Sequence, residues 1–114
     1  MDATSTIDAL GALAQEHRLA AFRQLVQAGD KGMAAGSIAE ALGIANSSLS
    51  FHLAQLRGAG LILQERQHRS LIYRANYPAM NALLAYLTEN CCAGSGACEP
   101  VSSPCKPRKQ GALP

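Results

Sequence analysis

The stretch NSSLSFHLAQLRGAGL, residues 46–61, decides how this chain is expected to fold. Leu49, Leu53 and Leu56 recur at helical spacing, so they predict a helix that has one apolar stripe and ends near Arg57. The other faces of this helix present small hydroxyls, an amide and one outward aromatic ring. Small polar side chains allow the backbone of a helix to approach another surface closely. We therefore expect this helix to bind a partner with its polar side.

A shorter helix is expected just before it. Ser37 and Glu40 stand in capping-box register, and Gly43, which takes a positive φ easily, is expected to end the helix that they open. Asn46 or Ser47 would then cap the longer helix. A short helix, a glycine turn and a second helix with a small polar N-terminus form the helix-turn-helix plan, in which the second helix enters the major groove of DNA.

A β-hairpin is expected after the helix pair. Residues 61–66 and 70–74 have the composition of two strands, and the turn that joins them is basic. A hairpin directly after a recognition helix is a wing, whose basic tip lies along phosphates or reaches a minor groove.

Serine and asparagine can bond to bases or phosphates, and an outward phenylalanine can meet a thymine methyl group. The predicted DNA-binding residues are Asn46, Ser47, Ser48, Ser50, Phe51, His52, Gln55, Arg66, His68 and Arg69.

Three further helices are expected around this unit. Apolar residues at helical spacing predict helices over residues 5–15, 17–27 and 78–88, the first opened by Ser5 and Asp8 in an approximate capping box. The first and last of these helices have apolar stripes that the core of one chain leaves uncovered. We expect both stripes to pair with a second copy of the chain in a homodimer; the alternative is that one stripe is simply core.

The composition agrees with one small, mainly α-helical domain that contains a β-hairpin. The chain has 114 residues, 48% of them hydrophobic, no run of 18 apolar residues and no charged-then-apolar leader. We expect a cytoplasmic protein with no membrane partner. The net charge is only +2, but between residues 44 and 74 four arginines and two histidines oppose one glutamate. This local excess favours a nucleic-acid partner, although a plain solvated surface can have the same composition.

The last quarter of the chain contains all four cysteines, Cys91, Cys92, Cys98 and Cys105. A secreted disulfide scaffold would distribute its cysteines through the fold, whereas the first 90 residues contain none. We expect a DNA-binding and dimerisation domain over residues 1–90 and a flexible cysteine-containing tail over residues 91–114. Cytosolic thiols stay reduced, and such clusters are more often metal-binding or catalytic than structural.

The patterns that an enzyme would need are absent from the sequence. It has no Ser-His-Asp set with supporting motifs, no glycine-rich phosphate loop and no Cys-x-x-Cys motif before a helix. No catalytic residue is therefore expected. A thiol-redox sensor and a small metallochaperone are the other classes to weigh, and a metallochaperone would not need a helix-turn-helix with a wing.

Four segments together resemble the ArsR/SmtB family of metal-responsive repressors: residues 13–25, 37–42, 47–61 and 66–73. The resemblance covers about residues 7–90, in order, and no single segment is diagnostic. It implies a homodimeric winged-helix repressor that binds an operator in its apo form. It also implies that the operator is released when a metal or metalloid binds.

Two sensing sites of that family have no counterpart in this chain. The cysteine cluster on the first helix of the helix-turn-helix is absent, because residues 37–43 contain no cysteine. The zinc-type site on the last helix is absent too, because residues 78–90 offer only Glu89 as a ligand. What remains is Cys91, Cys92 and Cys98, which resembles the arrangement of ArsR repressors whose arsenite site is at the C-terminus.

The chemistry of the three thiols agrees with As(III) or Sb(III) as the inducer. Trivalent arsenic and antimony prefer three thiolates in a pyramid, whereas zinc prefers four sulfur or nitrogen ligands. The small residues 93–97 allow the chain to fold back so that the three sulfurs meet one ion. Cys105 is expected to be a spectator, and as a fourth ligand it would suit zinc or cadmium better. The alternatives are therefore a zinc- or cadmium-responsive repressor, a thiol-redox-responsive repressor, or an unused cysteine cluster.

Overall fold

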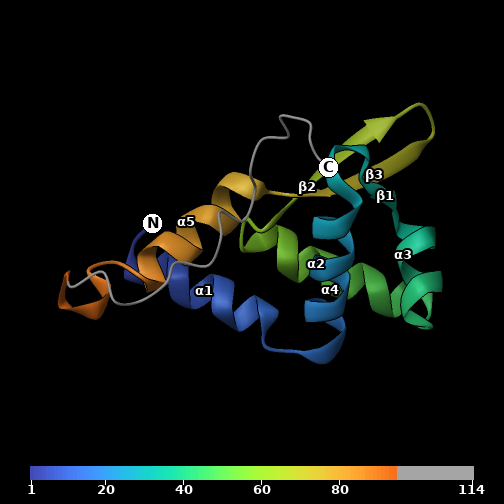
Figure 1. Cartoon of the computed structure of the whole chain (residues 1–114). Coiled ribbons are helices and arrows are strands. Elements are labelled where there is room, and N and C mark those ends of the chain that lie inside the picture. Colours follow the sequence, from blue (N-terminus) through green and yellow to red (C-terminus); the bar gives the residue numbers. More distant parts are fainter. Residues whose placement is uncertain (95–114) are drawn as a thin grey trace.

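The computed structural model describes residues 1–94, which form five α-helices around a small antiparallel sheet (Figure 1). The elements in chain order are α1 (Ala3–Leu13), α2 (Glu16–Ala28), the 3-10 turn η1 (Gly29–Lys31), β1 (Met33–Ala34), α3 (Ala35–Leu42), α4 (Asn46–Gly58), β2 (Ile62–Gln67), β3 (Ser70–Ala75), α5 (Tyr77–Leu87) and the 3-10 turn η2 (Cys91–Gly94). The expected fold class, mainly α with a β-hairpin in a winged helix-turn-helix, is confirmed. None of the helices in residues 1–94 is both long and apolar enough to cross a membrane.

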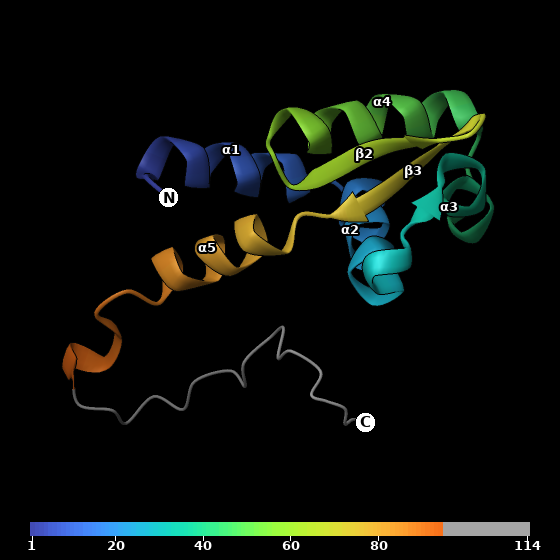
Figure 2. The ribbon, with the colours of Figure 1, turned by 90° about the horizontal axis from the view of Figure 1, so that it is seen from above.

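The helix-turn-helix and the wing lie at one end of the molecule, and α1 and α5 lie side by side at the other (Figures 1 and 2). Helix α4 is the recognition helix of this plan, and it connects the two ends along one side of the molecule. The C-terminal end of α4 leads directly into β2, so the recognition helix and the wing are joined by a short turn. The elements expected to bind DNA therefore share one end, and those expected to dimerise share the other.

The core forms where α2, α3, α4 and the sheet meet. Its largest fully buried side chains are Leu25, Ile38, Leu49, Leu56, Leu61 and Ile62. The leucine stripe of α4 is confirmed as core, because Leu53 is also buried. Full burial of one such side chain contributes roughly 1.5–3 kcal/mol relative to leaving it in water. This stripe turns the polar faces of α4 outward.

The sheet has three strands in the order β1-β3-β2, all antiparallel. The hairpin is paired from Ile62 with Ala75 at its base to Gln67 with Ser70 at its tip, in agreement with the expected wing. Strand β1 was not expected, because two residues are too few to show a period of two. Gly32 makes this third strand possible: its φ is 68°, and a Cβ there would lie 2.5 Å from the carbonyl oxygen of Tyr73.

The expected helix caps are partly wrong. Helix α1 is capped by Asp2, whose carboxylate accepts from the backbone N–H of Ser5 at 2.8 Å, so Ser5 is not the cap. Helix α3 begins three residues earlier than expected and α4 one or two residues earlier, each after an alanine that has no side-chain cap bond. The capping box of Ser37 and the cap by Asn46 are therefore not formed. Gly43 is confirmed as the C-cap of α3, with a left-handed φ of 71°.

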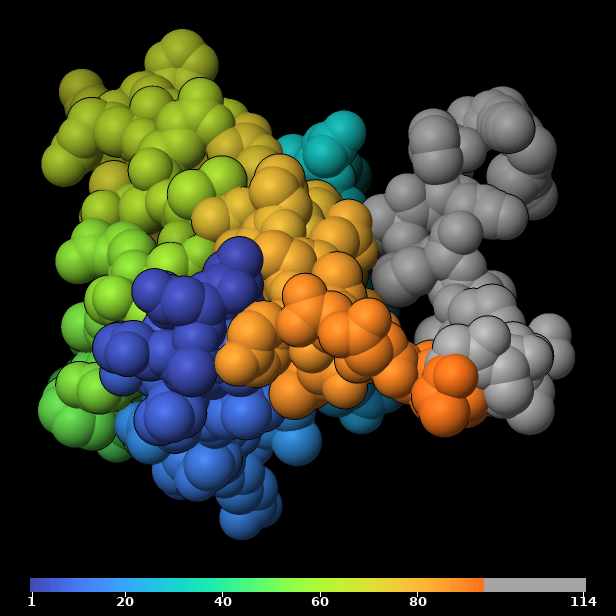
Figure 3. All heavy atoms as spheres, turned by 90° about the vertical axis from the view of Figure 1, so that its left-hand side faces the viewer, coloured from blue at the N-terminus to red at the C-terminus, as the bar shows by residue number. Residues whose placement is uncertain are grey.

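The outward faces of α1 and α5 keep large apolar side chains in contact with solvent. The buried face of α1 is made of Thr6, Ala9 and Ala12, while its larger apolar residues Ile7 and Leu10 are 67% and 42% exposed. The same holds on α5, where the following side chains are exposed: Leu84 and Leu87. Figure 3 looks onto this end of the molecule, where the two helices form one continuous surface. Within residues 1–94, both stripes therefore lack full cover, as expected.

Candidate nucleic-acid interface

The exposed face of α4 includes most of the DNA contacts that were predicted on this helix from the sequence. Six of the predicted DNA contacts on this helix are exposed: Asn46, Ser47, Ser48, Ser50, Phe51 and Gln55. Phe51 is 60% exposed, although an apolar ring of this size is normally covered in a small domain. With the leucine stripe held in the core, this face is free to lie in a groove of DNA, and the ring of Phe51 projects from it.

His52 differs from the other predicted contacts because its ring lies against the start of α2. Its Nδ1 is 3.5 Å from a guanidinium nitrogen of Arg18, and its ring centroid is 5.7 Å from that of His17. A guanidinium only donates, so Nδ1 is the acceptor and the proton of the neutral ring is on Nε2. Partial burial, the charge of Arg18 and the neighbouring His17 all lower the pKa of His52. Its role at DNA stays a prediction, but the ring is directed toward α2.

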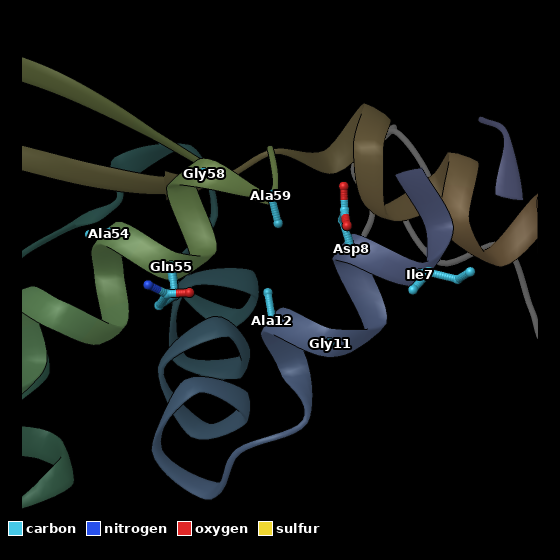
Figure 4. Close-up of a pocket in the computed structure, with 8 residues that line it drawn as sticks. All are labelled: Ile7, Asp8, Gly11, Ala12, Ala54, Gln55, Gly58 and Ala59. Atoms are coloured by element: carbon cyan, nitrogen blue, oxygen red, sulfur yellow. The ribbon is translucent and has the colours of Figure 1, made fainter. Parts of the chain in front are cut away.

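Helix α1 and the recognition helix enclose an open groove of about 500 Å³ (Figure 4). The groove is lined by Ile7, Asp8, Gly11, Ala12, Ala54, Gln55, Gly58 and Ala59. Most of these side chains are small, so the two helices present little bulk to this space. Gln55 lies on the α4 wall of the groove, next to the helix expected to dimerise. The predicted base contact of Gln55 therefore has to be made beside α1.

The wing places its three predicted DNA contacts in solvent. Arg66, His68 and Arg69 are all exposed at the hairpin tip, where His68 has a left-handed φ of 58° that turns the chain. Within residues 1–94 there is one ion pair, between Arg74 and Glu65. Arg66 and Arg69 are therefore not neutralised by a carboxylate in the described part of the chain. Their charges are available to phosphates.

The other two arginines of the basic segment bond to neighbouring groups of the same chain. Arg74 pairs with Glu65 and also donates through Nε to the carbonyl of Asp30 at 2.6 Å. Arg57 donates to Oε1 of Gln64 at 3.0 Å. The amide of Gln64 in turn donates to the hydroxyl of Tyr73 at 2.8 Å, so a chain of side chains joins the recognition helix to both strands of the wing. The sequence did not separate these structural arginines from the two at the tip.

The thiols that the structure describes lie just beyond α5. Cys91 is exposed and Cys92 half-buried, both in the turn η2. Asn90, Cys92 and Ala93 all have left-handed φ values, of 57°, 58° and 51°, and for cysteine and alanine this conformation is costly. Within residues 1–94 no three histidine, cysteine or acidic side chains come close enough to hold a metal ion. Cys98 and Cys105 lie outside the described residues, so the predicted three-thiol site stays a prediction.

Two residues that bond to the recognition helix or to the turn after it were missed by the sequence analysis. Arg18 reaches it from α2, and Asn76 bonds to the turn that follows it. Their partners are 34 and 16 residues away along the chain. No periodicity or motif connects residues at such separations. Only the folded chain shows these contacts.

Comparison with known proteins supports a role in DNA binding. Residues 13–65 match a family model described as a helix-turn-helix domain. The chain is 31% identical over 88 residues to the nodulation protein NolR of Rhizobium meliloti, covering 77% of this chain and 70% of that protein. It is also 34% identical over 64 residues to the HTH-type transcriptional regulator YgaV of Escherichia coli K12. That match covers 56% of this chain and 65% of YgaV, slightly less than two thirds of its length.

Solved structures agree on the architecture. An ArsR-like transcriptional regulator from Rhodococcus sp. RHA1 superposes with a TM-score of 0.66 at 25% identity, covering 76% of this chain and 78% of that one. The homodimeric winged helix-turn-helix domain of Mb0332 from Mycobacterium bovis gives 0.61 at 27% identity, covering 76% and 81%. Reduced HlyU from Vibrio cholerae gives 0.59 at 29% identity, covering 74% and 88%. By these descriptions the similar proteins include transcriptional regulators and a homodimeric DNA-binding domain.

Proposed function

The chain belongs to the ArsR/SmtB family of transcriptional regulators, and from this premise we propose that it is a metalloid-responsive repressor. In this proposal the apo homodimer binds operator DNA. Arsenite or antimonite then binds the thiolates of Cys91, Cys92 and Cys98, and the dimer leaves the operator. The observation that carries the proposal is the position of Cys91 and Cys92 directly after α5, whose exposed leucines belong to the expected dimer surface.

The DNA-binding part rests on the exposed face of α4 and on the charges of Arg66 and Arg69, which no carboxylate in residues 1–94 pairs. A helix of this kind fits a major groove, while Arg66 and Arg69 lie close enough in sequence to follow one phosphate strand. In a symmetric dimer the two recognition helices enter successive major grooves, about 34–36 Å apart. The operator would accordingly contain two related half-sites.

The dimer part rests on the apolar surfaces of α1 and α5. Exposed side chains such as Ile7 and Leu87 lose water contact when two such surfaces meet, at about 25 cal/mol for each Å² of apolar surface removed from water. Mb0332, which has the same architecture, is described as homodimeric. An isologous pair also places the two C-terminal segments symmetrically about the interface.

The inducer part rests on the chemistry of the thiols. Three thiolates suit the pyramidal coordination of As(III) or Sb(III), and Cys92 stands in a strained left-handed conformation next to Cys91. Rearranging this turn around an ion would relieve the strain and displace the end of α5. Coupling between two sites typically changes an affinity by about 5- to 150-fold, which is the range expected for operator release.

The test is operator binding by the reduced, full-length protein, measured by fluorescence anisotropy. The probe is a duplex enriched by that protein from a random-sequence library, and arsenite, zinc and a thiol oxidant are titrated separately. Arsenite is expected to raise the Kd at least tenfold. Replacing Cys91, Cys92 or Cys98 with Ala should keep DNA binding but abolish this response. Cys105→Ala is the matched control and should respond like the wild type.

A thiol-redox-responsive repressor is the second candidate, and one observation favours it. HlyU, which has the same architecture, was solved in a form described as reduced. Two thiols of this chain could give up two protons and two electrons to hydrogen peroxide, forming one disulfide and two molecules of water. Release by the oxidant but not by arsenite would select this candidate. Release by zinc, lost in Cys105→Ala, would instead indicate a four-thiolate zinc or cadmium sensor.

A further inference from the structure

We propose that Asn76 is a positioning residue that holds the recognition helix α4 at a set angle to α5, and thereby sets operator affinity and half-site spacing. This inference rests on the DNA-binding and dimer parts of the proposed function. It does not depend on the identity of the inducer, because it concerns the geometry of the dimer before any inducer binds. Asn76 is half-buried at the junction between the wing and α5.

All four polar groups of Asn76 are used, and they connect two helices. Its side-chain amide donates to the carbonyl of Gly60 at 2.8 Å, and its backbone N–H donates to the carbonyl of Leu61 at 2.9 Å. Its side-chain oxygen accepts from the backbone N–H of Ala79 at 3.3 Å, and its backbone carbonyl accepts from the backbone N–H of Met80 at 3.0 Å. The first pair of bonds reaches the end of α4, and the second pair caps α5.

Gly60 and Leu61, whose carbonyls accept from Asn76, are themselves bonded to α4. The N–H of Gly60 donates to the carbonyl of Arg57 at 3.0 Å, and that of Leu61 donates to the carbonyl of Leu56 at 3.1 Å. Gly60 has a left-handed φ of 79°, which closes this turn tightly, and Leu61 is fully buried. The turn is therefore a rigid extension of the recognition helix. A group that bonds to its carbonyls bonds in effect to α4.

The start of α5 is also fastened to α2. The hydroxyl of Tyr77, the first residue of α5, donates to the carbonyl of Val26 at 3.0 Å, near the end of α2. The first turn of α5 is thus bonded to two other helices. The other end of α5 leads to Cys91 in η2. The bonds of Asn76 at this junction therefore link the orientation of α5 to the orientation of α4.

A small change in the angle at this junction produces a larger displacement at the far end of α4. The helix has 13 residues, so at 1.5 Å per residue it is about 20 Å long. A tilt of about 6° at its C-terminal end would move its N-terminal end by about 2 Å. The predicted base contacts begin at that N-terminal end, with Asn46. A shift of this size exceeds the tolerance of a hydrogen bond to a base, so the angle set by Asn76 matters for specific recognition.

Two substitutions at Asn76 remove the hydrogen bond to Gly60 while keeping the cap of α5. Asn76→Asp and Asn76→Ser both keep a side-chain oxygen that can cap α5, and at an N-cap these residues are nearly equivalent. Both lose the amide that donates to Gly60, and they differ in charge from each other. Asn81→Asp is the matched control, because it makes the same chemical change at an exposed position on the same helix.

The experiment measures Kd by fluorescence anisotropy for full-length reduced protein on three kinds of probe. The first is the duplex that the wild type enriches from a random library, the second has one base pair added or removed between the half-sites, and the third has a scrambled sequence. Both Asn76 variants should bind the enriched duplex about tenfold more weakly and discriminate less between spacings. Their affinity for scrambled DNA should stay unchanged, because the wing arginines are intact. Asn81→Asp should match the wild type throughout.

Sedimentation and thermal melting of each variant complete the test. The Asn76 variants are expected to remain dimers and to melt within a few degrees of the wild type. Unchanged affinity and unchanged spacing preference would overturn the inference. Equal losses on enriched and scrambled DNA, with a much lower melting temperature, would also overturn it, because the role would then be merely structural. If the wild type enriches no duplex at all, the DNA-binding proposal itself fails.

Discussion

The guanidinium of Arg18 lies 3.5 Å from Nδ1 of His52, on the inner side of the recognition helix. The same side chain donates through Nε to the carbonyl of Ala12 at 2.7 Å, in the last turn of α1. One arginine of α2 therefore connects the helix expected to dimerise with the helix expected to bind DNA. Arg18 reaches the middle of α4 and Asn76 the turn after its C-terminal end, so these two residues tie the recognition helix to both helices of the expected dimer surface.

Replacing Arg18 with Ala should lower the free energy of unfolding by roughly 1–3 kcal/mol. The variant loses a charged hydrogen bond to a carbonyl at a helix end and leaves that carbonyl and Nδ1 of His52 without this donor. Urea unfolding followed by circular dichroism measures the change. Arg23→Ala is the control, since Arg23 is exposed on the same helix. An equal effect in both variants would mean that the bonds of Arg18 add nothing.

The stability of the protein should depend on pH through His52. Its pKa in the fold is below the ordinary value of 6.5, so the unfolded chain binds more protons than the native one in a window just below pH 6.5. Stability is therefore complete above pH 6.5 and decreases as the pH falls through the lowered pKa. His52→Gln should reduce this pH dependence. The midpoint of urea unfolding, measured between pH 5 and 8, tests this prediction. Identical plots of midpoint against pH for His52→Gln and the wild type would contradict it.

Gly32→Ala should destabilise the fold by at least about 2 kcal/mol. The position has a φ of 68°, and the added Cβ would meet the carbonyl oxygen of Tyr73 at 2.5 Å. Gly36→Ala is the matched control, because Gly36 lies in α3 with nothing within 4 Å of the added atom. There alanine should stabilise by about 0.5–1 kcal/mol through its higher helix propensity. Denaturant unfolding of the two variants should give opposite signs.

Charge removal at the wing tip should weaken DNA binding in a salt-dependent way. Arg66→Ala or Arg69→Ala should each reduce the slope of log Kd against log salt by about one and weaken binding to all sequences alike. Arg74→Ala is the comparison, because Arg74 is paired with Glu65 inside the protein. Anisotropy titrations at several salt concentrations give the slopes. Unchanged slopes for both tip variants would exclude phosphate contacts there.

Lysine at the exposed leucine of α5 should disrupt the dimer. Leu87 is 53% exposed in one chain, and Leu87→Lys would place a charge in the expected interface, weakening association by at least about tenfold. Leu63 is 50% exposed on the wing, so Leu63→Lys adds the same charge at a similarly exposed leucine away from α1 and α5. Analytical ultracentrifugation over a range of concentrations gives the dimer dissociation constants of the two variants and the wild type. If only Leu63→Lys dissociates, the dimer surface lies on the wing.

The sequence by itself determined the order of elements and the direction in which α4 faces. Helical spacing of Leu49, Leu53 and Leu56 is a local property, and burying that stripe leaves only one outward side for the serines and Phe51. The glycine end of α3 and the hairpin after α4 also follow from neighbours in the chain, because a positive φ at Gly43 and a basic turn near His68 are short-range preferences.

Only the tertiary structure decided which polar residues serve the fold and which remain for DNA. Arg57 and Arg74 look like Arg66 and Arg69 in the sequence, yet the first two bond to Gln64, Glu65 and the carbonyl of Asp30. His52 likewise points to Arg18, 34 residues earlier, and Asn76 bonds to Gly60. Hydrogen bonds and ion pairs act over a few ångströms in space, so the residues that satisfy them are chosen by packing and not by spacing along the chain.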